Sequence, residues 1–316
     1  MAFHLNYRSP YDFDAVLGFL ARRAIPGVED VSGGRYRRHI RLSGNTGSLC
    51  VARMPGHDRL ICEIDLTGAV PPEPLVRRVR RMFDLDADPD EIQRGLRTDP
   101  RLAAIVRQRP GLRIPGAWDA FEIAVRAVVG QQISVTAATT VMGRIARDYG
   151  TGDTQGSVFP SPRELSVIEP GDLPMPGARA RAIRELARAV LDGRVELDTG
   201  RPEERVRQLT LLPGIGPWTA NYIAMRVGGD PDAFPAGDLV LLRAAESLFG
   251  IRGQRELETR AEAWRPWRAY AAMHLWAQAG VPDCPGESNR PGVSQGRDRH
   301  TPASPLPATE QESNRA

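Results

Sequence analysis

Apolar residues in the first seventy positions follow a helical pattern and then a strand pattern. Between Asp12 and Arg23 they recur at every third or fourth residue, and Pro26 and Gly27 follow, which predicts an amphipathic helix that ends there. Three later runs, separated by turns that contain glycine, are typical of strands and cover residues 36–42, 48–54 and 60–66. We therefore expect residues 1–70 to form an α+β domain, in which an antiparallel sheet packs with helix.

The first of the three strand-like runs is strongly basic. It carries Arg37, Arg38 and Arg41, and Arg35 comes just before it. We interpret these side chains as a solvated face of the sheet, because charged residues on a strand are usually exposed.

The apolar spacing becomes helical after the proline-rich segment at residues 71–74. Short helices are predicted at residues 74–83, 89–96 and 101–107, a long helical region at 117–149 with an interruption near Gly130, and a further helix at 178–191. Residues 151–162 are predicted to be a polar connector, and no strand is predicted between Pro74 and Gly280. The stretch 283–316 has almost no apolar residues, so we expect a disordered tail.

Composition narrows the possible chemistry. The formal net charge is +3 and the sequence pI is about 9.0, which mildly favours an anionic partner. All 42 basic residues are arginines, so no side-chain amine is present to form a Schiff base. The three cysteines are scattered, unlike a disulfide framework or a metal cluster, and no apolar run is long enough to span a membrane. We expect a cytoplasmic protein without membrane association.

A glycine-rich turn between two helical patterns is the most informative stretch. The turn is Pro213-Gly214-Ile215-Gly216, and Pro217 opens the second helix. Glycines let the backbone approach a ligand, and the free N–H groups of the second helix favour an anion such as a phosphodiester. An ordinary connection between two helices is the alternative, and Gly-x-Gly by itself does not exclude it.

A second polar segment interrupts the long helical region. Gln131 and Gln132 follow Gly130 between two apolar segments. Their amides either cap the helix ends or contact a ligand, and the sequence leaves both interpretations open.

The wider pattern around the turn resembles a known family. Residues 212–220 read Leu-Pro-Gly-Ile-Gly-Pro-Trp-Thr-Ala, and Pro235-Ala236-Gly237-Asp238 follows. Together they resemble the helix-hairpin-helix/Gly-Pro/Asp (HhH-GPD) superfamily of DNA glycosylases, and within it the 3-methyladenine DNA glycosylase II group of the AlkA type. Further similar segments lie at residues 11–20, 82–85, 111–116 and 264–268.

The resemblance implies a domain arrangement. An N-terminal α+β domain would be followed by two mainly α-helical domains that flank a cleft. Residues 71–112 would pack with the C-terminal helices, residues 113–229 would form the domain with the helix-hairpin-helix motif at about 203–227, and residues 230–282 would form the domain with the catalytic aspartate.

The resemblance also implies the catalytic residue. Asp238 aligns with the family's catalytic carboxylate, which would stabilise the oxocarbenium-like sugar, orient the attacking water, or both. Considered alone, Asp238 is better explained as the N-cap of the helical pattern that follows it, and the two roles are compatible.

The base pocket and the DNA contacts follow from the same resemblance. The pocket would be formed by Trp218, Tyr222, Phe19, Trp276 and Leu239. The DNA-binding residues would be Gly214, Ile215, Gly216, Thr219, Gln131 and Gln132. A monovalent cation would be held by the backbone carbonyls of Thr210, Leu212 and Ile215, and no cofactor would be needed for the chemistry.

The expected activity is that of a monofunctional glycosylase. Bifunctional members of the superfamily carry a lysine directly after the residue that matches Pro217, and this chain has Trp218 there. The substrate would be duplex DNA with alkylated purines of the 3-methyladenine or 7-methylguanine type, whose positive charge suits an aromatic pocket. We expect a monomer that associates with the nucleoid.

Two alternatives remain open from the sequence. The chain would otherwise be a non-catalytic helix-hairpin-helix protein that binds DNA or abasic sites, or a glycosylase for other damaged bases.

Two positions depart from the family pattern. Gln132 matches an apolar residue that wedges into the duplex in the family, and Leu239 matches an aromatic residue. His274 is expected to be structural, and Trp264 and Trp267 are assigned to packing.

Overall fold

The computed structural model describes residues 1–153 and 156–279. The N-terminal part is a five-stranded antiparallel sheet in the order β1-β5-β4-β3-β2. Its strands are β1 (Ala2–Asn6), β2 (Glu29–Ser32), β3 (Arg35–Leu42), β4 (Asn45–Arg53) and β5 (Arg59–Leu66), and α1 (Phe13–Arg23) and α2 (Pro72–Met82) accompany them. The predicted tail at 283–316 lies outside the described residues.

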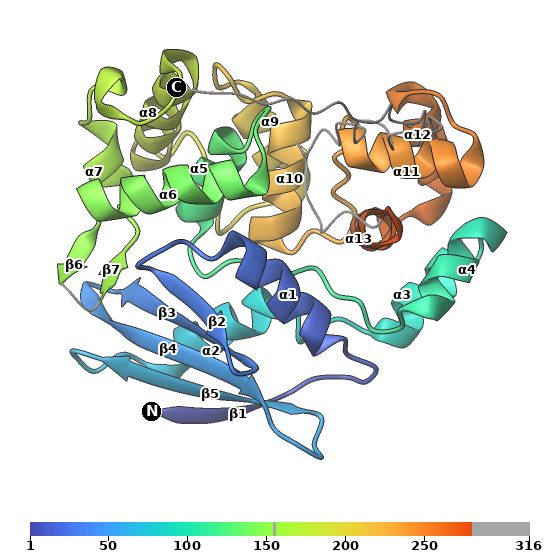
Figure 1. The fold of residues 1–316 in the computed structure, drawn as a ribbon, viewed down its shortest axis with the longest axis horizontal. Helices are drawn as coiled ribbons and strands as arrows, with labels where there is room; N and C mark the ends of the chain where they lie inside the picture. Colours follow the sequence, from blue (N-terminus) through green and yellow to red (C-terminus); the bar gives the residue numbers. More distant parts are fainter. Residues whose placement is uncertain (154–155, 280–316) are drawn as a thin grey trace, which may run out of the picture.

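One face of the sheet forms part of the core. Alternate residues such as Tyr36, Ile40 and Val51 are buried, which is the strand periodicity that the sequence shows. α1 contacts β2 and β3, and Figure 1 shows it between the sheet and the remaining helices. The sheet therefore supports the C-terminal end of α1, which reaches the candidate site.

The interpretation of the basic strand as fully solvated is wrong for Arg38. Arg38 shares the inward face with Tyr36 and Ile40, and its guanidinium donates to Glu122 at 2.7 Å and lies 3.7 Å from Glu29. Arg35 and Arg37 are exposed as expected. The alternation of side chains along the strand places Arg38 inside, and the two carboxylates compensate its buried charge.

The prediction that no strand follows Pro74 is also wrong. β6 (Thr151–Asp153) and β7 (Gly156–Val158) pair antiparallel within the predicted connector. They are three residues long and contain two glycines, so they lack an alternating apolar signal. β7 contacts β3, and this tertiary contact supports a pair that its own sequence does not indicate.

The rest of the described chain is helical. Helices lie at α3 (Pro89–Leu96), α4 (Pro100–Gln108), α5 (Ala120–Val129), α6 (Val135–Tyr149), α7 (Pro162–Ser166), η1 (Pro170–Asp172), α8 (Gly177–Leu191), α9 (Pro202–Thr210), α10 (Pro217–Gly228), α11 (Leu239–Phe249), α12 (Gln254–Ala261), η2 (Glu262–Trp264) and α13 (Arg268–Gln278). α10 contacts α9 and α5, and α13 contacts α11 and α4. The fold class expected from the sequence is confirmed.

Trp264 and His274 lie in the core, as expected for structural residues. Trp264 is buried and donates its indole N–H to Asp99 at 3.1 Å. His274 is buried in α13, where burial and the nearby Arg109 lower its pKa to about 4. Within the described residues no helix has both the length and the apolar character needed to cross a membrane.

Candidate active site

Asp238 lies at the junction between the Pro-Ala-Gly segment and α11. It is the N-cap of this helix, and its Oδ1 accepts hydrogen bonds from the backbone N–H groups of Val240 and Leu241, both at 3.0 Å. Only 1% of Asp238 is exposed. The helix therefore fixes the carboxylate in one position, because its N-terminal N–H groups need an acceptor.

Two indole groups complete the surroundings of this carboxylate. Trp276 donates to Oδ1 at 3.0 Å and Trp218 donates to Oδ2 at 3.2 Å. Within the part of the chain that the structure describes, Oδ1 thus accepts three hydrogen bonds, whereas Oδ2 accepts one and keeps capacity for a water or a substrate group. Burial raises the pKa of Asp238, and the bonds from Trp276, Leu241, Trp218 and Val240 oppose that rise.

Trp218 and Tyr222 form the aromatic wall beside the carboxylate. They lie one helical turn apart on α10, and their rings stack with centroids 5.7 Å apart and planes 19° apart. Trp276 meets Tyr222 edge-on at 6.5 Å. Arg226 donates to the Tyr222 hydroxyl at 2.8 Å, so the position of the Tyr222 ring is fixed from both ends.

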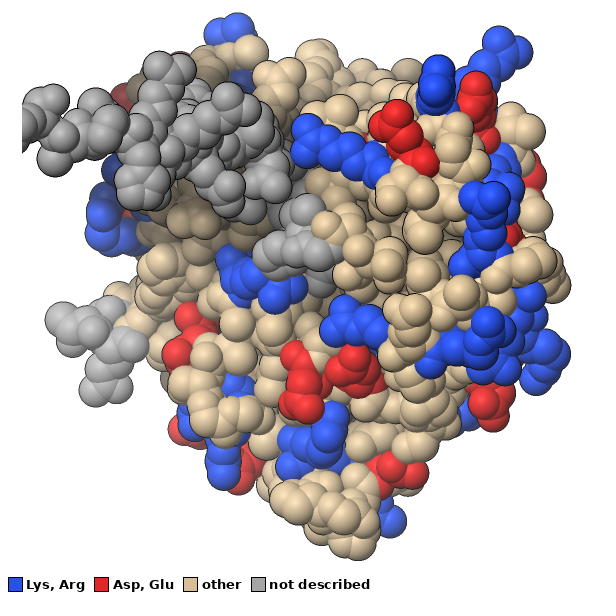
Figure 2. All heavy atoms as spheres, turned by 45° about the vertical axis from the view of Figure 1, so that its right-hand side comes forward, with Lys and Arg blue, Asp and Glu red and all other residues tan. Residues whose placement is uncertain are grey.

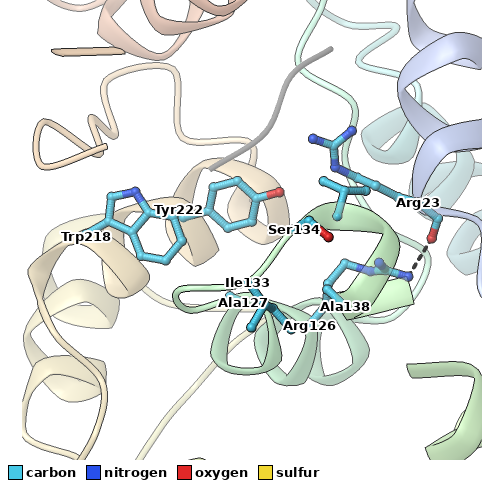
Figure 3. A pocket seen from close by; sticks show the side chains of 10 residues that line it. Arg23, Arg126, Ala127, Ile133, Ser134, Ala138, Trp218 and Tyr222 are labelled. Carbon is cyan, nitrogen blue, oxygen red and sulfur yellow. Dashed lines mark hydrogen bonds between the residues drawn. The ribbon is translucent and has the colours of Figure 1, made fainter. Parts of the chain in front are cut away.

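A pocket opens on the other side of these two rings. Its lining comes from α1, α5, α6, the loop between α5 and α6, and α10 (Figure 3). The lining residues are Arg23, Arg126, Ala127, Gly130, Ile133, Ser134, Val135, Ala138, Trp218 and Tyr222. Its volume is about 30 Å³, which is room for a water molecule or two.

Three residues expected in the base pocket do not line this cavity. Phe19 is buried and does not line the pocket, because the guanidinium of Arg23 lies over its ring at 3.7 Å and that of Arg226 at 4.4 Å. Trp276 lies behind Tyr222 and contacts Asp238 instead. Leu239 is 61% exposed at the start of α11, because the N-cap geometry turns its side chain away from the core.

The helix-hairpin-helix motif consists of α9, the turn and α10. Gly214 has a φ of +84°, and a Cβ there would come within 2.9 Å of Ala182, so the turn requires glycine at this position. Gly216 has an ordinary φ of −85° and open space where a Cβ would lie. Nothing among the described residues therefore requires glycine at Gly216, in contrast to Gly214.

Gln131 connects the loop between α5 and α6 to this hairpin. Its side-chain amide donates to the Gly214 carbonyl at 2.9 Å and to the Thr219 hydroxyl at 3.0 Å. Gln132 is exposed and has a φ of +60°, which is uncommon for a residue other than glycine. The amide donors of Gln131 are thus occupied within the protein, whereas the Gln132 side chain reaches solvent.

The hairpin carbonyls are compatible with a monovalent cation. Backbone oxygens are the hard ligands that such ions prefer, and the Leu212 carbonyl accepts from the Ile215 N–H at 3.1 Å while retaining a second lone pair. Leu212 and Ile215 have buried side chains, so their backbone positions are well fixed. Among the described residues no cluster of three His, Cys, Asp or Glu side chains could bind a metal ion.

Charged side chains of both signs lie on the face of the molecule that Figure 2 draws. On the face in Figure 2, arginines gather toward the right-hand edge and acidic side chains lie among them. The formal net charge of +3 is thus the small difference between many basic and acidic groups.

Three arginines near the pocket were not predicted from the sequence. Arg23 and Arg126 line it, and Arg226 donates to the Pro115 and Gly116 carbonyls as well as to Tyr222. Arg23 and Arg126 lie on separate helices of a chain with many arginines. Only their position in apolar helical faces distinguishes them from surface arginines.

Comparison with protein families matches almost the whole described chain. The AlkA N-terminal domain model matches residues 2–119, and the model of the HhH-GPD superfamily base excision DNA repair proteins matches residues 125–269. The two models meet at the start of α5, close to the pocket.

Individual relatives and one solved structure agree with the family models. DNA-3-methyladenine glycosylase 2 of Escherichia coli is 35% identical over 87% of this chain and 97% of its own length. The probable bifunctional transcriptional activator/DNA repair enzyme AlkA of Mycobacterium tuberculosis is 45% identical over 87% of this chain, which spans 56% of that protein's length. The 3-methyladenine DNA glycosylase of Archaeoglobus fulgidus has a similar fold, with a TM-score of 0.76 at 22% identity over 88% of this chain and 98% of that one.

The geometry and the comparisons agree on one assignment. The antiparallel sheet lies within the residues that the first family model matches. The helix-hairpin-helix and the Pro-Ala-Gly-Asp segment with its buried capping aspartate lie within those that the second model matches. The chain belongs to the AlkA family of the HhH-GPD superfamily of base excision DNA repair proteins.

Proposed function

We propose that the chain is a monofunctional DNA glycosylase that hydrolyses the N-glycosidic bond of alkylated purines in duplex DNA. The observation that carries this proposal is the buried carboxylate of Asp238, whose Oδ2 accepts, among the described residues, only the indole N–H of Trp218. The names of the E. coli and A. fulgidus relatives, both 3-methyladenine glycosylases, support this substrate class.

Departure of the base leaves positive charge on the sugar, and a fixed carboxylate stabilises that charge. At 4 Å and an effective dielectric constant near 20 the attraction is about 4 kcal/mol, which corresponds to roughly a thousandfold in rate. The Asp238 oxygen with spare capacity, Oδ2, would face the sugar or hold the attacking water. The base leaves with the electron pair of the C1′–N bond, water adds to C1′ of the resulting sugar cation, and the proton that this water loses passes to the Asp238 carboxylate or to solvent.

The absence of an amine supports hydrolysis without strand cleavage. Trp218 occupies the position after Pro217, and the sequence contains no lysine, so no side chain supplies the Schiff base that a lyase step needs. The product would be an intact abasic site.

DNA binding would begin at the hairpin. The N-terminus of α10 and the turn at Gly214 and Gly216 would bind the phosphate backbone, with the hairpin carbonyls holding a monovalent cation beside it. Gln132 would fill the gap left by the flipped nucleotide, and the base would stack on Trp218 and Tyr222. The chain would act on chromosomal DNA as a monomer.

The experiment compares release of free methylpurines from methylated duplex DNA by the wild type and by Asp238→Asn. Asparagine retains an oxygen that can cap α11, so the variant should fold, bind abasic-analogue DNA and release at least a hundredfold less base. Asp99→Asn is a matched control, because Asp99 is also a buried N-cap aspartate that accepts an indole N–H and lies outside the pocket lining.

Each other outcome points to a specific alternative. Unchanged release by Asp238→Asn would refute the catalytic assignment. Binding without release by the wild type would favour a non-catalytic protein that binds DNA or abasic sites. Release of oxidised or deaminated bases with no methylpurines would favour a glycosylase for other damaged bases.

A further inference from the structure

The exposed face of α6 carries a stripe of polar and basic side chains. Its opposite face is apolar and buried. The members of the stripe are exposed and follow one another at spacings of four, four and three residues, which places them on one side of the helix: Thr136, Thr140, Arg144 and Arg147. The chain has 39 acidic residues, yet none lies between Glu122 and Asp148, so the stripe contains no carboxylate.

A groove runs beside the basic end of this stripe, and we call it the α6 groove. Its volume is about 590 Å³, and it lies between α6, the turn that follows α1 and the β6–β7 pair. Five of its lining residues are glycines. Gly143 lets α6 lie directly against the turn, since a Cβ there would come within 3.1 Å of the Pro26 ring. The walls are therefore largely backbone, which an extended ligand can approach closely.

Arg144 and Arg147 are the charged side chains among the described lining residues of the α6 groove. Arg147 donates to its neighbour Asp148 at 2.8 Å, but both side chains are exposed, so water screens this pair. Arg144 is exposed and forms no hydrogen bond or ion pair with any described residue. The groove thus has positive charge and no acidic group in its described lining, which suits a polyanion with an extended backbone.

The stripe begins close to the part of the site that would meet the lesion. Gln132 lies three positions before α6, and Gln131 holds this loop on the hairpin at Gly214. Figure 1 shows α6 running from this region toward the β6–β7 pair. Along the helix axis the stripe covers about 16 Å, close to five base-pair steps of about 3.4 Å. Because duplex DNA is stiff over such a length, a duplex held at Gln132 and lying along α6 would bring its phosphates to the groove without bending.

We propose that the stripe on α6 and the α6 groove bind the phosphate backbone of the duplex on one side of the lesion, about five base pairs away from it, with Arg144 as the principal contact. This inference rests on the proposed function, in which Gln132 fills the gap at the lesion. Guanidinium and hydroxyl groups bind phosphate oxygens whatever the base sequence. The contact therefore adds affinity for undamaged flanking DNA and no preference between lesions.

The test measures binding to two duplexes that differ in the direction of their longer arm. Each contains one tetrahydrofuran abasic analogue, with an arm of about three base pairs on one side and an arm of about fourteen on the other, so that the shorter arm ends before the groove. The longer arm is 5′ of the analogue in one duplex and 3′ of it in the other. Fluorescence anisotropy gives the dissociation constants of the wild type and of Arg144→Gln at several salt concentrations.

Arg144→Gln should weaken binding of one duplex, the one whose longer arm lies along α6, by about three- to tenfold. Binding of the other duplex should not change. For the affected duplex the slope of log Kd against log salt concentration should fall by about 0.9, the value for one phosphate contact. Arg144→Glu adds a repulsive charge and should weaken the same duplex further. Melting curves verify that both variants fold.

Arg107→Gln is the matched control. Arg107 is exposed on α4 and has no hydrogen bond or ion pair with any described residue, so the substitution removes the same charge from a comparable position. Figure 1 shows α4 at the opposite end of the molecule from β6 and β7. Binding of both duplexes by Arg107→Gln should equal that of the wild type.

Equal weakening of the two duplexes by Arg144→Gln, or the same weakening by Arg107→Gln, would overturn the inference, because general attraction to DNA would then explain the effect. Wild-type affinity of Arg144→Gln for both duplexes would also overturn it and leave the proposed function intact. Release of free methylpurines by the wild type is measured in parallel. A wild type that binds these duplexes but releases no base would refute the proposed function, which separates the two failures.

Discussion

The indole N–H of Trp276 and the Oδ1 oxygen of Asp238 lie 3.0 Å apart, although 38 positions separate them in the sequence. This hydrogen bond leaves Oδ2 as the oxygen with spare capacity, and it favours the ionised form of the carboxyl group.

Trp276→Phe removes that donor and keeps an aromatic ring against Tyr222. Loss of the bond should raise the pKa of Asp238, so the ionised fraction falls and base release declines at a higher pH than in the wild type. A hydrogen bond to a charged group contributes about 1.5 kcal/mol, so we expect about a tenfold loss at acidic pH, and a smaller loss at alkaline pH. Single-turnover rates of base release, measured for the wild type and Trp276→Phe at several pH values, test this expectation.

The control is Trp264→Phe, since Trp264 donates to a different buried carboxylate, that of Asp99. Its pH profile should coincide with that of the wild type. Identical shifts in the two variants would mean that the profile reports general loosening of the fold.

The two hairpin glycines should respond differently to alanine. Gly214→Ala forces a positive φ and a clash with Ala182, so it should lower the free energy of unfolding by about 1–2 kcal/mol. Gly216→Ala meets open space and should leave the melting temperature nearly unchanged while weakening binding to abasic-analogue DNA. Thermal melting and DNA titration together separate the effect on folding from the effect on DNA binding. A lowered melting temperature in both variants would contradict the prediction that Gly216 serves DNA binding and not folding.

Two buried groups, Asp84 and His274, should make the free energy of unfolding depend on pH in opposite directions. Burial raises the pKa of Asp84 to about 6 from its usual 3.8, so the folded state holds more protons than the unfolded state and stability falls as pH rises from about 4 to 6. The pKa of His274 is lowered to about 4 from 6.5, so its contribution rises over a similar window. In the wild type the two largely cancel.

Asp84→Asn should therefore make stability rise more steeply between pH 4 and 6, and His274→Gln should make it rise less. Asparagine keeps an oxygen for the Ile114 N–H and the Tyr270 hydroxyl. Urea unfolding at several pH values measures both slopes. The same dependence of stability on pH in the two variants and the wild type would show that Asp84 and His274 do not set these slopes.

Glu122→Gln should be strongly destabilising, because it leaves Arg38 with less compensation in a buried site. Breaking a buried pair costs about 3–5 kcal/mol, measured as the change in the free energy of unfolding. Glu204→Gln is the control, since Glu204 pairs with Arg207 at 2.6 Å on the surface, and it should leave the denaturant midpoint nearly unchanged. Comparable losses of unfolding free energy in the two variants would show that burial does not determine how strongly the Arg38–Glu122 pair stabilises the fold.

Much of the fold could be predicted from local patterns. The helix after Asp12, the interruption near Gly130 and the helix that starts at Pro217 all follow from spacing and end signals that the structure bears out. The β6–β7 pair could not be predicted, because its stabilising contact comes from β3, far away in the sequence.

The candidate site also contains residues that the sequence identifies and residues that it does not. Asp238, Trp218 and Tyr222 lie together, and their motif is contiguous enough to recognise. Phe19 was expected in the pocket, but Arg23 and Arg226 cover its ring. Helix packing decides which of the 42 arginines become buried. Local sequence patterns do not specify that packing, so Arg23 and Arg226 could not be identified from them.

The hydrogen bonds of Gln131 link two parts of the molecule that would do different work on DNA. Its amide fastens the loop that carries Gln132 to the turn at Gly214 and to Thr219. Under the proposed function, a displacement of the hairpin on the phosphate backbone would therefore carry the tip of that loop with it. Binding of the backbone by the hairpin and insertion of Gln132 into the base stack would be coupled, because one side chain joins the two segments that perform them.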